Sequence, residues 1–348
     1  MPVAGHDTIV VGAGIVGLAV AREVLARRPG SKLLVVDRER AAARHQSSHN
    51  SGVIHAGVYY APGSLKARLC VEGAARMYAY CERNGIDVTR VGKLIVALDE
   101  RELPALDELA RRAAVNRVPG VRRLDARGLR EVEPHATGLA ALHSPNTGIV
   151  DFAAVCERLA HDVREAGGEL RWGWKVAAVD ASARAIRLRS AAGDTAEGAR
   201  AIFCAGLWSD RLAVLAGAGP DPRIVPFRGA YLRLRPQRRE LVRGLVYPVP
   251  DPSLPFLGVH LTRRIDGEVV LGPTALLAGA RDGYDLTALR AADVRDLLSW
   301  PGTWRMMARW WRTGLSELRL AASRTALAAE AARYVPALRG EDLLPGFA

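Results

Sequence analysis

The sequence predicts an α/β fold, α+β overall, with about two domains. The chain has 348 residues, of which 49% are hydrophobic and 25% charged. This balance allows real hydrophobic cores, and it excludes disordered, collagen-like and small disulfide-stapled proteins. A glycine-rich turn lies between an apolar strand and a helix near the N-terminus, and residues 223–274 are rich in strands and turns. A parallel sheet is therefore expected first and an antiparallel sheet later.

The first thirty residues have the order of a Rossmann-like dinucleotide-binding unit. The β-branched run Asp7–Val11 predicts a buried parallel strand, and a helix is predicted over residues 18–28. Between them, Gly12 permits a tight turn, Gly14 lets the backbone approach a pyrophosphate, and Gly17 lets the helix pack on the strand. The helix N-terminus then offers unpaired N–H groups to the phosphates.

A second buried strand, Leu33–Val36, ends at an acidic residue, Asp37. The Asp37 carboxylate is placed to accept hydrogen bonds from a ribose diol. Arg38 follows directly and has two interpretations, contact with a 2′-phosphate or a solvated side chain after the strand. The motif does not separate NAD from FAD, although its N-terminal position is more usual in FAD proteins.

The segment from His45 to Leu65 carries no formal charge over 21 residues. Its polar side chains can donate and accept hydrogen bonds without a fixed charge, as the edge of a neutral flavin ring requires. Its glycines let the backbone lie close to a flat cofactor. His45, His49 and His55 also raise the question of a metal site, but no Cys, Asp or Glu in the segment completes one, so no metal is expected.

With this segment the chain resembles a known family, the FAD-dependent L-2-hydroxyglutarate dehydrogenases/oxidases of the D-amino-acid-oxidase-like group. The resemblance is strongest in HQSSHNSGVIHAGVYYAPGSLKA, residues 45–67, and covers residues 7–345. Further matching stretches are Gly92–Ala97, Pro145–Asp151, Cys204–Asp210, Pro222–Gly229 and Leu271–Pro273. The resemblance implies FAD as the cofactor and a 2-hydroxy diacid substrate that is oxidised to 2-oxoglutarate.

The motifs and the resemblance together predict which residues bind the cofactor. They are Gly12, Gly14, Ile15, Val16, Gly17, Asp37, Arg38, His45, Ser48, His49, Asn50, Ser51, Gly52, Val53, Val176, Ala205, Gly206 and Trp208. The contact from Val176, in a strand pair near the adenine, is implied by the resemblance alone. For Gly206 the alternative is an ordinary turn at the end of a strand.

The sequence departs from the family pattern in two ways. Thr274, Ala230 and Gly279–Ala280 stand where the family usually has Asn, an acid and Phe-Lys. Family members also continue after a segment like Asp342–Pro345 into an Arg-bearing strand and a closing segment that contact the flavin and the substrate carboxylate. Because these elements are not in this sequence, the chain alone is expected to bind FAD weakly or to expose an unpaired sheet edge.

The order of the remaining elements predicts a discontinuous FAD-binding domain. Helices are predicted over residues 64–83, 100–117 and 153–166, and strands over 93–98, 169–179, 186–190 and 201–204. The FAD-binding domain is expected to take residues 1–75 and 148–222. A substrate domain with an antiparallel sheet is expected to take residues 76–147 and 223–345.

Oxidation of a 2-hydroxy acid requires a base for the hydroxyl proton and an acceptor for the hydride. His55 is the predicted base, because imidazole has a useful pKa and the neutral segment is expected to edge the flavin. His260 is the second candidate, since its strand-like segment is expected to line the substrate chamber.

The two substrate carboxylates require cations or strong donors, and planar guanidinium groups suit them well. Arg228 and Arg263 are predicted to bind the carboxylates, with Tyr231 and Lys66 as secondary donors. For Arg228 the alternative is a surface arginine in a basic run. For Arg263 it is the flank of a hairpin turn.

The net charge of +12 favours an anionic partner. Residues 223–243 hold seven Arg and one Glu, but they lack the interleaved aromatic residues of single-strand binding, so no nucleic acid is expected. The expected partners are a small 2-hydroxy diacid and, as electron acceptor, quinone or oxygen. Two alternatives remain: a related flavin oxidoreductase acting on an amino acid or glycerol phosphate, and a non-catalytic nucleotide- or RNA-binding short form.

The location of the protein is expected to be cytoplasmic. Its four cysteines are scattered, no apolar run approaches the roughly 18 residues of a membrane span, and no signal peptide is evident. Tryptophans lie beside arginines within residues 301–339, which has two interpretations. One is helical core packing with snorkelling arginines, and the other is peripheral contact with the inner face of the cell membrane.

Overall fold

The computed structural model describes residues 5–251, 254, 257–285 and 287–348. The chain forms two compact units, each made of two separate stretches. Unit 1 comprises Met1–Asn50 and Asp151–Pro226, and unit 2 comprises Ser51–Val150 and Phe227–Ala348. The first crossing between the units therefore follows residue 50 rather than residue 75, the boundary expected from sequence.

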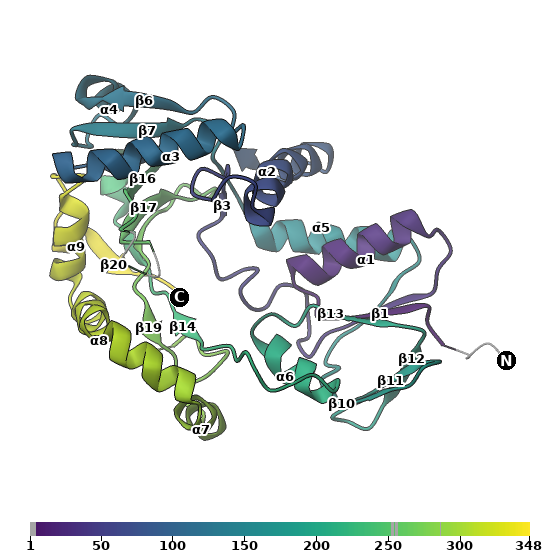
Figure 1. Cartoon of the computed structure of the whole chain (residues 1–348). Coiled ribbons are helices and arrows are strands. Elements are labelled where there is room, and N and C mark those ends of the chain that lie inside the picture. The colour runs from purple at the N-terminus through teal and green to yellow at the C-terminus, as the bar shows by residue number, and fades with distance from the viewer. Residues whose placement is uncertain (1–4, 252–253, 255–256, 286) are drawn as a thin grey trace. The chain divides into compact units, whose positions relative to one another are not determined.

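Unit 1 is built on a parallel four-stranded sheet with the order β13-β1-β2-β9. Its strands are β1 (Thr8–Val11), β2 (Leu33–Val36), β9 (Glu169–Arg171) and β13 (Ala201–Phe203). Every residue of β1 and β2 is buried, as their continuous apolar runs predict. Helices α1 (Ile15–Arg27) and α5 (Phe152–Glu165) pack against each other on this sheet (Figure 1).

A smaller antiparallel sheet completes unit 1. The strand predicted over residues 169–179 is in fact two strands in different sheets, because Gly173, at φ +67°, turns the chain between them. The small sheet contains β10 (Val176–Ala181), β11 (Ile186–Ser190) and β12 (Thr195–Gly198). After β13 the chain forms the short helices η2 (Gly206–Trp208) and α6 (Ser209–Leu215).

Unit 2 contains an eight-stranded sheet with the order β20-β15-β18-β17-β16-β5-β7-β6. All its neighbouring strands are antiparallel except β5 and β16, which are parallel, so the sheet is mixed rather than purely antiparallel. The strands are β5 (Lys93–Ala97), β6 (Arg122–Asp125), β7 (Ala140–Ser144), β15 (Leu232–Leu234), β16 (Leu245–Pro248), β17 (His260–Arg263), β18 (Val269–Gly272) and β20 (Leu343–Pro345).

The eight-stranded sheet separates two hydrophobic cores. Leu94 and Val96 belong to one core, whereas Ile95 and Ala97 belong to the other, because alternate residues of β5 face opposite sides. The helices of unit 2 are α2 (Leu65–Arg83), α3 (Leu103–Val115), α4 (Ala126–Val132), α7 (Ala291–Ser299), α8 (Pro301–Ala322) and α9 (Arg324–Ala332), with short helices η1 (Glu100–Glu102), η3 (Pro236–Leu241) and η4 (Gly340–Asp342). Helix α8 is kinked at Trp310.

Two small sheets in the described ranges attach further segments to unit 2. Strand β8 (Gly148–Val150) pairs with both β3 (Val53–Ile54) and β4 (Val88–Thr89), and β14 (Phe227–Arg228) pairs with β19 (Leu276–Leu277). The β3–β8 pairing explains why the chain enters unit 2 at residue 51, earlier than expected.

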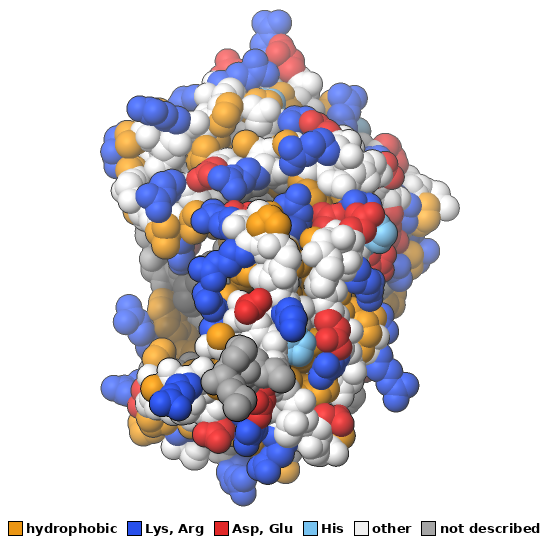
Figure 2. All heavy atoms as spheres, turned by 90° about the vertical axis from the view of Figure 1, so that its right-hand side faces the viewer, with side chains coloured by type: hydrophobic (Ala, Val, Ile, Leu, Met, Phe, Trp, Pro, Cys, Tyr) orange, Lys and Arg blue, Asp and Glu red, His pale blue; other side chains and the backbone are white. Residues whose placement is uncertain are grey.

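No helix in the described ranges is long and apolar enough to cross a membrane. The basic excess is dispersed on the face shown in Figure 2, where Lys and Arg side chains lie among acidic and apolar ones.

Candidate functional site

The glycine-rich turn of unit 1 has no room for a side chain at Gly12 or Gly17 and little room at Gly14. Gly12 has a φ of +108°, and a Cβ there would lie 2.3 Å from the Cys204 carbonyl oxygen. A Cβ at Gly17 would lie 1.8 Å from the Gly12 carbonyl oxygen, and one at Gly14 would lie 3.1 Å from Ser47 Oγ. The sequence roles expected for these glycines, a tight turn and a close start of α1, match this crowding.

Side chains from neighbouring segments bind the backbone of this turn. Ser47 Oγ accepts a hydrogen bond from the Ile15 N–H at 3.0 Å, at the first residue of α1. The Asp37 carboxylate, at the end of β2, accepts one from the Ala13 N–H at 2.6 Å and another from the Glu39 N–H at 2.7 Å. Asp37 thus fixes the turn, and each of its oxygens keeps a further lone pair.

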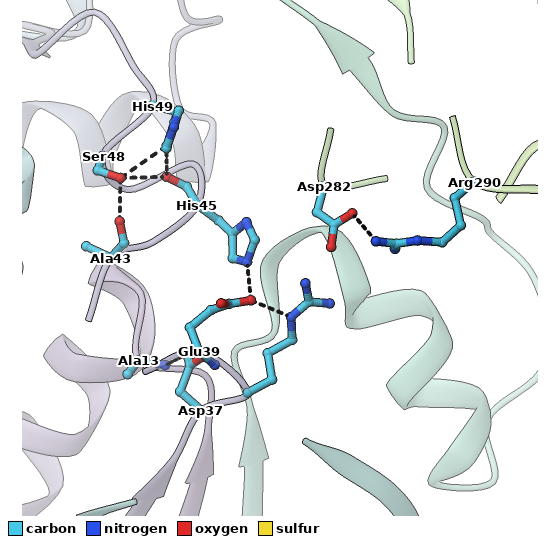
Figure 3. Close-up of polar contacts among 10 residues, drawn as sticks. Ala13, Asp37, Glu39, Ala43, His45, Ser48, His49, Asp282 and Arg290 are labelled. Atoms are coloured by element: carbon cyan, nitrogen blue, oxygen red, sulfur yellow. Dashed lines mark hydrogen bonds and ion pairs between the residues drawn. The ribbon is translucent and has the colours of Figure 1, made fainter. Parts of the chain in front are cut away.

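Three predicted cofactor residues of unit 1 are linked to one another. Arg38 Nε donates to Glu39 Oε1 at 2.8 Å, and His45 Nε2 lies 2.9 Å from the same oxygen (Figure 3). The Arg38 guanidinium lies 4.7 Å from the Trp208 ring centre, and that of Arg211 lies 4.9 Å from it. The hydrogen bond from Arg38 holds the pKa of Glu39 below its ordinary value. Arg38, His45 and Trp208 therefore belong to one local network.

The polar residues that follow fold back onto their own turn. Ser48 Oγ donates to the Ala43 carbonyl and lies 3.1 Å from the His45 carbonyl oxygen. His49 Nδ1 lies 3.0 Å from that same oxygen (Figure 3). Asn50 Nδ2 donates to two carbonyls of the turn, each at 3.0 Å. These side-chain hydrogen bonds to backbone carbonyls stabilise the turn at the end of the first stretch of unit 1.

The remaining predicted cofactor residues divide between the units. In unit 1, the Val16 side chain is exposed, Val176 is buried at the start of β10, and Ala205 precedes Gly206, which has a φ of +54°. Ser51, Gly52 and Val53 belong to unit 2.

One face of the eight-stranded sheet in unit 2 carries a group of polar side chains. The register places Lys93 beside Leu245 and Leu245 beside Thr262. Because residues two apart share a face, Tyr247 and His260 project from that face as well. The group, called the polar cluster below, comprises Lys93, Tyr247, His260 and Thr262 from the sheet, with His55 and Tyr59 from the segment after β3.

Lys93 is buried at the centre of the polar cluster. Its side chain is 1% exposed, and its Nζ lies 4.4 Å from the Tyr59 ring centre and 5.0 Å from that of Tyr247. Burial lowers the pKa of Lys93 to about 7. Among the described residues no carboxylate forms an ion pair with it.

Lys93 is not among the site residues predicted from sequence. The signal that identifies it is a lysine directly before the apolar run Leu94–Ala97, in a chain with few lysines. The other three lysines, Lys32, Lys66 and Lys175, are exposed.

The two histidines of the polar cluster are uncharged near neutral pH. Burial, with smaller effects from Lys93 and His260, lowers the pKa of His55 to about 3. His55 Nδ1 is buried and lacks a hydrogen-bond partner within the described residues. Burial lowers the pKa of His260 to about 4, and its Nδ1 lies 2.9 Å from the Gly258 carbonyl oxygen. Because a carbonyl only accepts, His260 carries its proton on Nδ1 and presents the Nε2 lone pair.

Aromatic side chains frame the polar cluster. The Tyr247 ring stacks on His260 with centroids 4.0 Å apart, and its hydroxyl lies 3.4 Å from Thr262 Oγ1. The Tyr59 hydroxyl is buried and, within the described part of the chain, has no hydrogen-bond partner. Burial raises the pKa of Tyr59 well above its ordinary value, so this hydroxyl keeps its proton.

Tyr231, a predicted secondary donor, lies just before β15. Burial raises the pKa of Tyr231 to about 12, and its ring stacks on Phe347 with centroids 5.2 Å apart. Gly272, which pairs with His260, has a φ of +145°, and a Cβ there would lie 3.1 Å from the Tyr231 ring. The glycine therefore keeps the sheet free of a side chain between His260 and Tyr231.

The other predicted substrate residues have different surroundings. Arg228 Nε donates to the Tyr284 carbonyl at 2.9 Å, whereas its buried Nη1 has no partner in the described ranges. Arg263 lies three residues after His260, so it projects from the opposite face of β17, and its guanidinium donates to the Val242 carbonyl at 3.4 Å. Lys66 is exposed in the first turn of α2. The structure thus brings neither Arg263 nor Lys66 into the polar cluster.

Comparison with known proteins identifies similar sequences over almost the whole chain. A family model described as FAD dependent oxidoreductase matches residues 7–304. A mitochondrial L-2-hydroxyglutarate dehydrogenase of Nematostella vectensis is 42% identical, over 98% of this chain and 78% of its own length. The Homo sapiens protein of that name is 41% identical over 98% and 76%. An L-2-hydroxyglutarate dehydrogenase of the bacterium Indibacter alkaliphilus is 38% identical over 98% and 85%.

Solved structures with the same fold are more distant in sequence. An L-α-glycerophosphate oxidase from Mycoplasma pneumoniae with FAD bound has a TM-score of 0.77 at 22% identity, over 99% of this chain and 82% of that one. A glycine oxidase from Geobacillus kaustophilus has a TM-score of 0.65 at 22% identity, over 84% and 76%. These similarities show the fold alone.

Proposed function

The chain belongs to the family of FAD-dependent oxidoreductases, and we propose that it oxidises L-2-hydroxyglutarate to 2-oxoglutarate. The observation that carries this proposal is the 38–42% identity, over 98% of the chain, to L-2-hydroxyglutarate dehydrogenases of animals and a bacterium. The polar cluster supports it, because a dianionic substrate requires a buried site with cationic and neutral groups and without competing carboxylates.

The residues of unit 1 fit the cofactor of this family. The crowded turn at Gly12, Gly14 and Gly17 leaves backbone rather than side chains at the start of α1, where a pyrophosphate binds. Asp37 would hold the ribose, with its remaining lone pairs. When bound, FAD supplies the acceptor for the hydride that leaves the substrate carbon.

The histidines of unit 2 supply the proton transfer that this oxidation needs. His55 is proposed as the base, since its buried Nδ1 lacks a partner in the described chain and is available for the substrate hydroxyl. A substrate dianion favours the protonated imidazole, and it would raise the His55 pKa from its low value. His260, whose Nδ1–H is held by Gly258, is proposed to accept a hydrogen bond and orient the substrate.

Arg228 is proposed to bind one substrate carboxylate. Its Nε is fixed by the Tyr284 carbonyl, and its buried Nη1 still needs an acceptor. Leaving a buried guanidinium nitrogen unpaired costs free energy, and a carboxylate removes that cost. Tyr231 is proposed as an additional donor on the same side of the sheet as His260.

Two alternatives receive less support. A flavin oxidoreductase acting on an amino acid or glycerol phosphate would share the fold, but the similarity to such structures is only 22% in sequence. A non-catalytic nucleotide- or RNA-binding protein would not need the buried base and cation of unit 2.

The substrate assignment is tested by product analysis with the FAD-loaded protein and an artificial electron acceptor. L-2-hydroxyglutarate, its D-enantiomer, glycerol 3-phosphate and L-glutamate are compared under identical conditions. Stoichiometric 2-oxoglutarate from the L-enantiomer alone is expected. Turnover of glycerol 3-phosphate or L-glutamate in preference to L-2-hydroxyglutarate would overturn the assignment.

We also propose that helix α8 binds the surface of an anionic membrane, with a quinone as electron acceptor. Apolar side chains spaced three or four residues apart along α8 are exposed by 40–57%. They are Trp304, Met307, Trp311, Leu315 and Leu318. The exposed charged residues of α8 are all arginines, since Glu317 is buried and accepts the Ala275 N–H at 2.6 Å. Exposed tryptophan beside arginine suits an interface with anionic lipid.

Flotation with vesicles tests this surface. The protein is expected to float with phosphatidylglycerol vesicles but not with phosphatidylcholine vesicles, and high salt should release it. A Trp304→Ser/Trp311→Ser double variant should lose binding, whereas Leu289→Ser, at a residue 76% exposed outside this stripe, should retain it. Equal flotation of the double variant and the unmodified protein would contradict membrane binding by α8. Reduction of oxygen but not of a quinone by the enzyme would contradict the proposed electron acceptor.

A further inference from the structure

We propose that Lys93 is the cation that binds the second substrate carboxylate, and that it takes up a proton when the diacid binds. This inference rests on the proposed function, which supplies a dicarboxylate ligand. It adds a residue that lies in the matching stretch Gly92–Ala97 but is not among the predicted substrate residues.

The surroundings of Lys93 favour a ligand rather than a structural ion pair. Its amino group lies among the rings of Tyr59 and Tyr247 at 4.4 and 5.0 Å, and no carboxylate of the described residues pairs with it. Aromatic faces attract a cation but do not replace a counter-ion. A buried ammonium without an anion is costly, so this position is best explained if a ligand brings the anion.

Two further buried atoms next to Lys93 also lack partners in the described chain. They are the Tyr59 hydroxyl and His55 Nδ1, from the segment that packs beside β5. A carboxylate bound to Lys93 would accept from the Tyr59 hydroxyl, and a substrate hydroxyl would donate to His55. One hydroxy acid thus satisfies three groups that the protein leaves unsatisfied.

The choice of lysine rather than arginine is also informative. The chain contains 49 Lys and Arg residues, and its other three lysines are exposed. Lysine can release its proton when buried, whereas arginine stays charged. The pKa of Lys93, lowered to about 7 by burial, allows the empty site to be largely neutral in mildly alkaline solution. An incoming carboxylate raises that pKa and draws a proton from solvent.

Other titratable groups face Lys93 and are accounted for. Burial raises the pKa of Cys70, Tyr59 and Tyr247, so these groups stay protonated and neutral. His55 and His260 stay unprotonated at the same pH, because their pKa values lie at about 3 and 4. Lys93 is therefore the group among them whose charge changes most readily between neutral and mildly alkaline pH.

Calorimetric titration of the FAD-loaded protein with glutarate tests the inference without turnover, because glutarate lacks the reacting hydroxyl. Titrations at about pH 8 in phosphate and in Tris, whose ionisation enthalpies differ, measure proton uptake. The unmodified protein is expected to take up about one proton per glutarate. Lys93→Met should weaken glutarate binding by about thirtyfold or more and abolish the uptake.

Two further variants separate charge from structure. Lys93→Arg should bind glutarate more tightly than Lys93→Met does but without proton uptake, because arginine is always protonated. Lys32→Met, at an exposed lysine, should behave like the unmodified protein. Glutarate binding by Lys93→Met within about twofold of the unmodified protein, or uptake that persists in that variant, would overturn the inference. Lys93-dependent glutarate binding without oxidation of L-2-hydroxyglutarate would instead overturn the proposed function alone.

Discussion

The ring of Tyr247 stacks on the imidazole of His260, with centroids 4.0 Å apart and planes inclined by 28°. The Gly258 carbonyl holds His260 Nδ1 at 2.9 Å, so both the ring plane and the tautomer are fixed. His55, by contrast, has a buried Nδ1 without a partner among the described residues. This difference supports the proposed roles, orientation for His260 and proton abstraction for His55, and it leads to the first prediction.

Replacing the base should lower turnover far more than replacing the orienting histidine. His55→Gln is expected to reduce kcat by about 100- to 10,000-fold, the range for loss of a general base. His260→Gln should mainly raise KM, with a smaller fall in kcat. Steady-state kinetics of both variants, with the exposed His161→Gln as control, checks this. A larger kcat loss for His260→Gln than for His55→Gln would reverse the two roles.

The neutral histidines should make the protein sensitive to acid. Their pKa values, about 3 and 4 in the folded state, lie below the ordinary 6.5, so the unfolded state binds more protons as the pH falls below 6.5. Each neutral histidine should stabilise the folded state above that pH. By about pH 5 its contribution to the free energy of unfolding should fall by on the order of 1–2 kcal/mol. Urea unfolding at several pH values measures this. A His55→Gln/His260→Gln double variant should show a flatter profile, and an equally steep one would contradict the assignment.

The crowded glycine turn should tolerate no side chain. Gly17→Ala places a methyl group 1.8 Å from the Gly12 carbonyl oxygen, so it should both destabilise unit 1 and remove bound FAD. Gly73→Ala, in the middle of α2 with nothing within 4 Å of the new Cβ, should stabilise by roughly 0.5–1 kcal/mol. Flavin absorbance per protein and thermal unfolding compare the pair. Full FAD content in Gly17→Ala would contradict the role of the turn.

Substitution of Arg228 and of Arg263, both predicted from sequence to bind substrate, should affect KM differently. Arg228→Gln is expected to raise KM by about 10- to 100-fold, because it removes a charged hydrogen bond to a carboxylate. Arg263→Gln should change KM little, because Arg263 projects from the opposite face of β17. Kinetics with L-2-hydroxyglutarate test both. Equal KM values for Arg228→Gln and the unmodified protein would remove Arg228 from the substrate site.

Lys93, the proposed substrate cation, should lower the free energy of unfolding of the ligand-free protein. Lys93→Met replaces a buried amino group that has no counter-ion in the described chain by an apolar side chain, so it should stabilise the ligand-free protein near neutral pH. The folded pKa of Lys93, about 7, lies below the ordinary 10.5, so the unmodified protein gains stability as the pH rises between these values. The stability advantage of Lys93→Met over the unmodified protein should therefore shrink as the pH rises from about 7 to 10.5. Urea unfolding without ligand measures it, and a strongly destabilised Lys93→Met would indicate a structural role.

The sequence predicted a substrate chamber lined by the strand that carries His260, but it did not include Lys93 among the site residues. His260 and Arg263 were both predicted as site residues, although their spacing of three places them on opposite faces of a strand. The register, which aligns β5 with β16 and β16 with β17, places Lys93 on the same face of the sheet as His260. Strand pairing between residues distant in sequence cannot be read from local patterns.

The fold could be predicted wherever a local pattern determines it. Strand Leu33–Val36 was predicted with its observed bounds, and helix α2 to within one residue. The first domain boundary was expected near residue 75, whereas unit 2 begins at Ser51. This boundary depends on the pairing of β3 with β8, which joins the two ends of the first stretch of unit 2. The parallel pairing of β5 with β16 likewise depends on distant segments.

The proposed reaction delivers two electrons from L-2-hydroxyglutarate to FAD bound by this chain. Its most direct test is the absorbance spectrum of the purified FAD-loaded protein under anaerobic conditions. Addition of L-2-hydroxyglutarate is predicted to bleach the flavin band near 450 nm, about one flavin per substrate oxidised. An unchanged flavin band with L-2-hydroxyglutarate, together with bleaching by dithionite, would contradict the account.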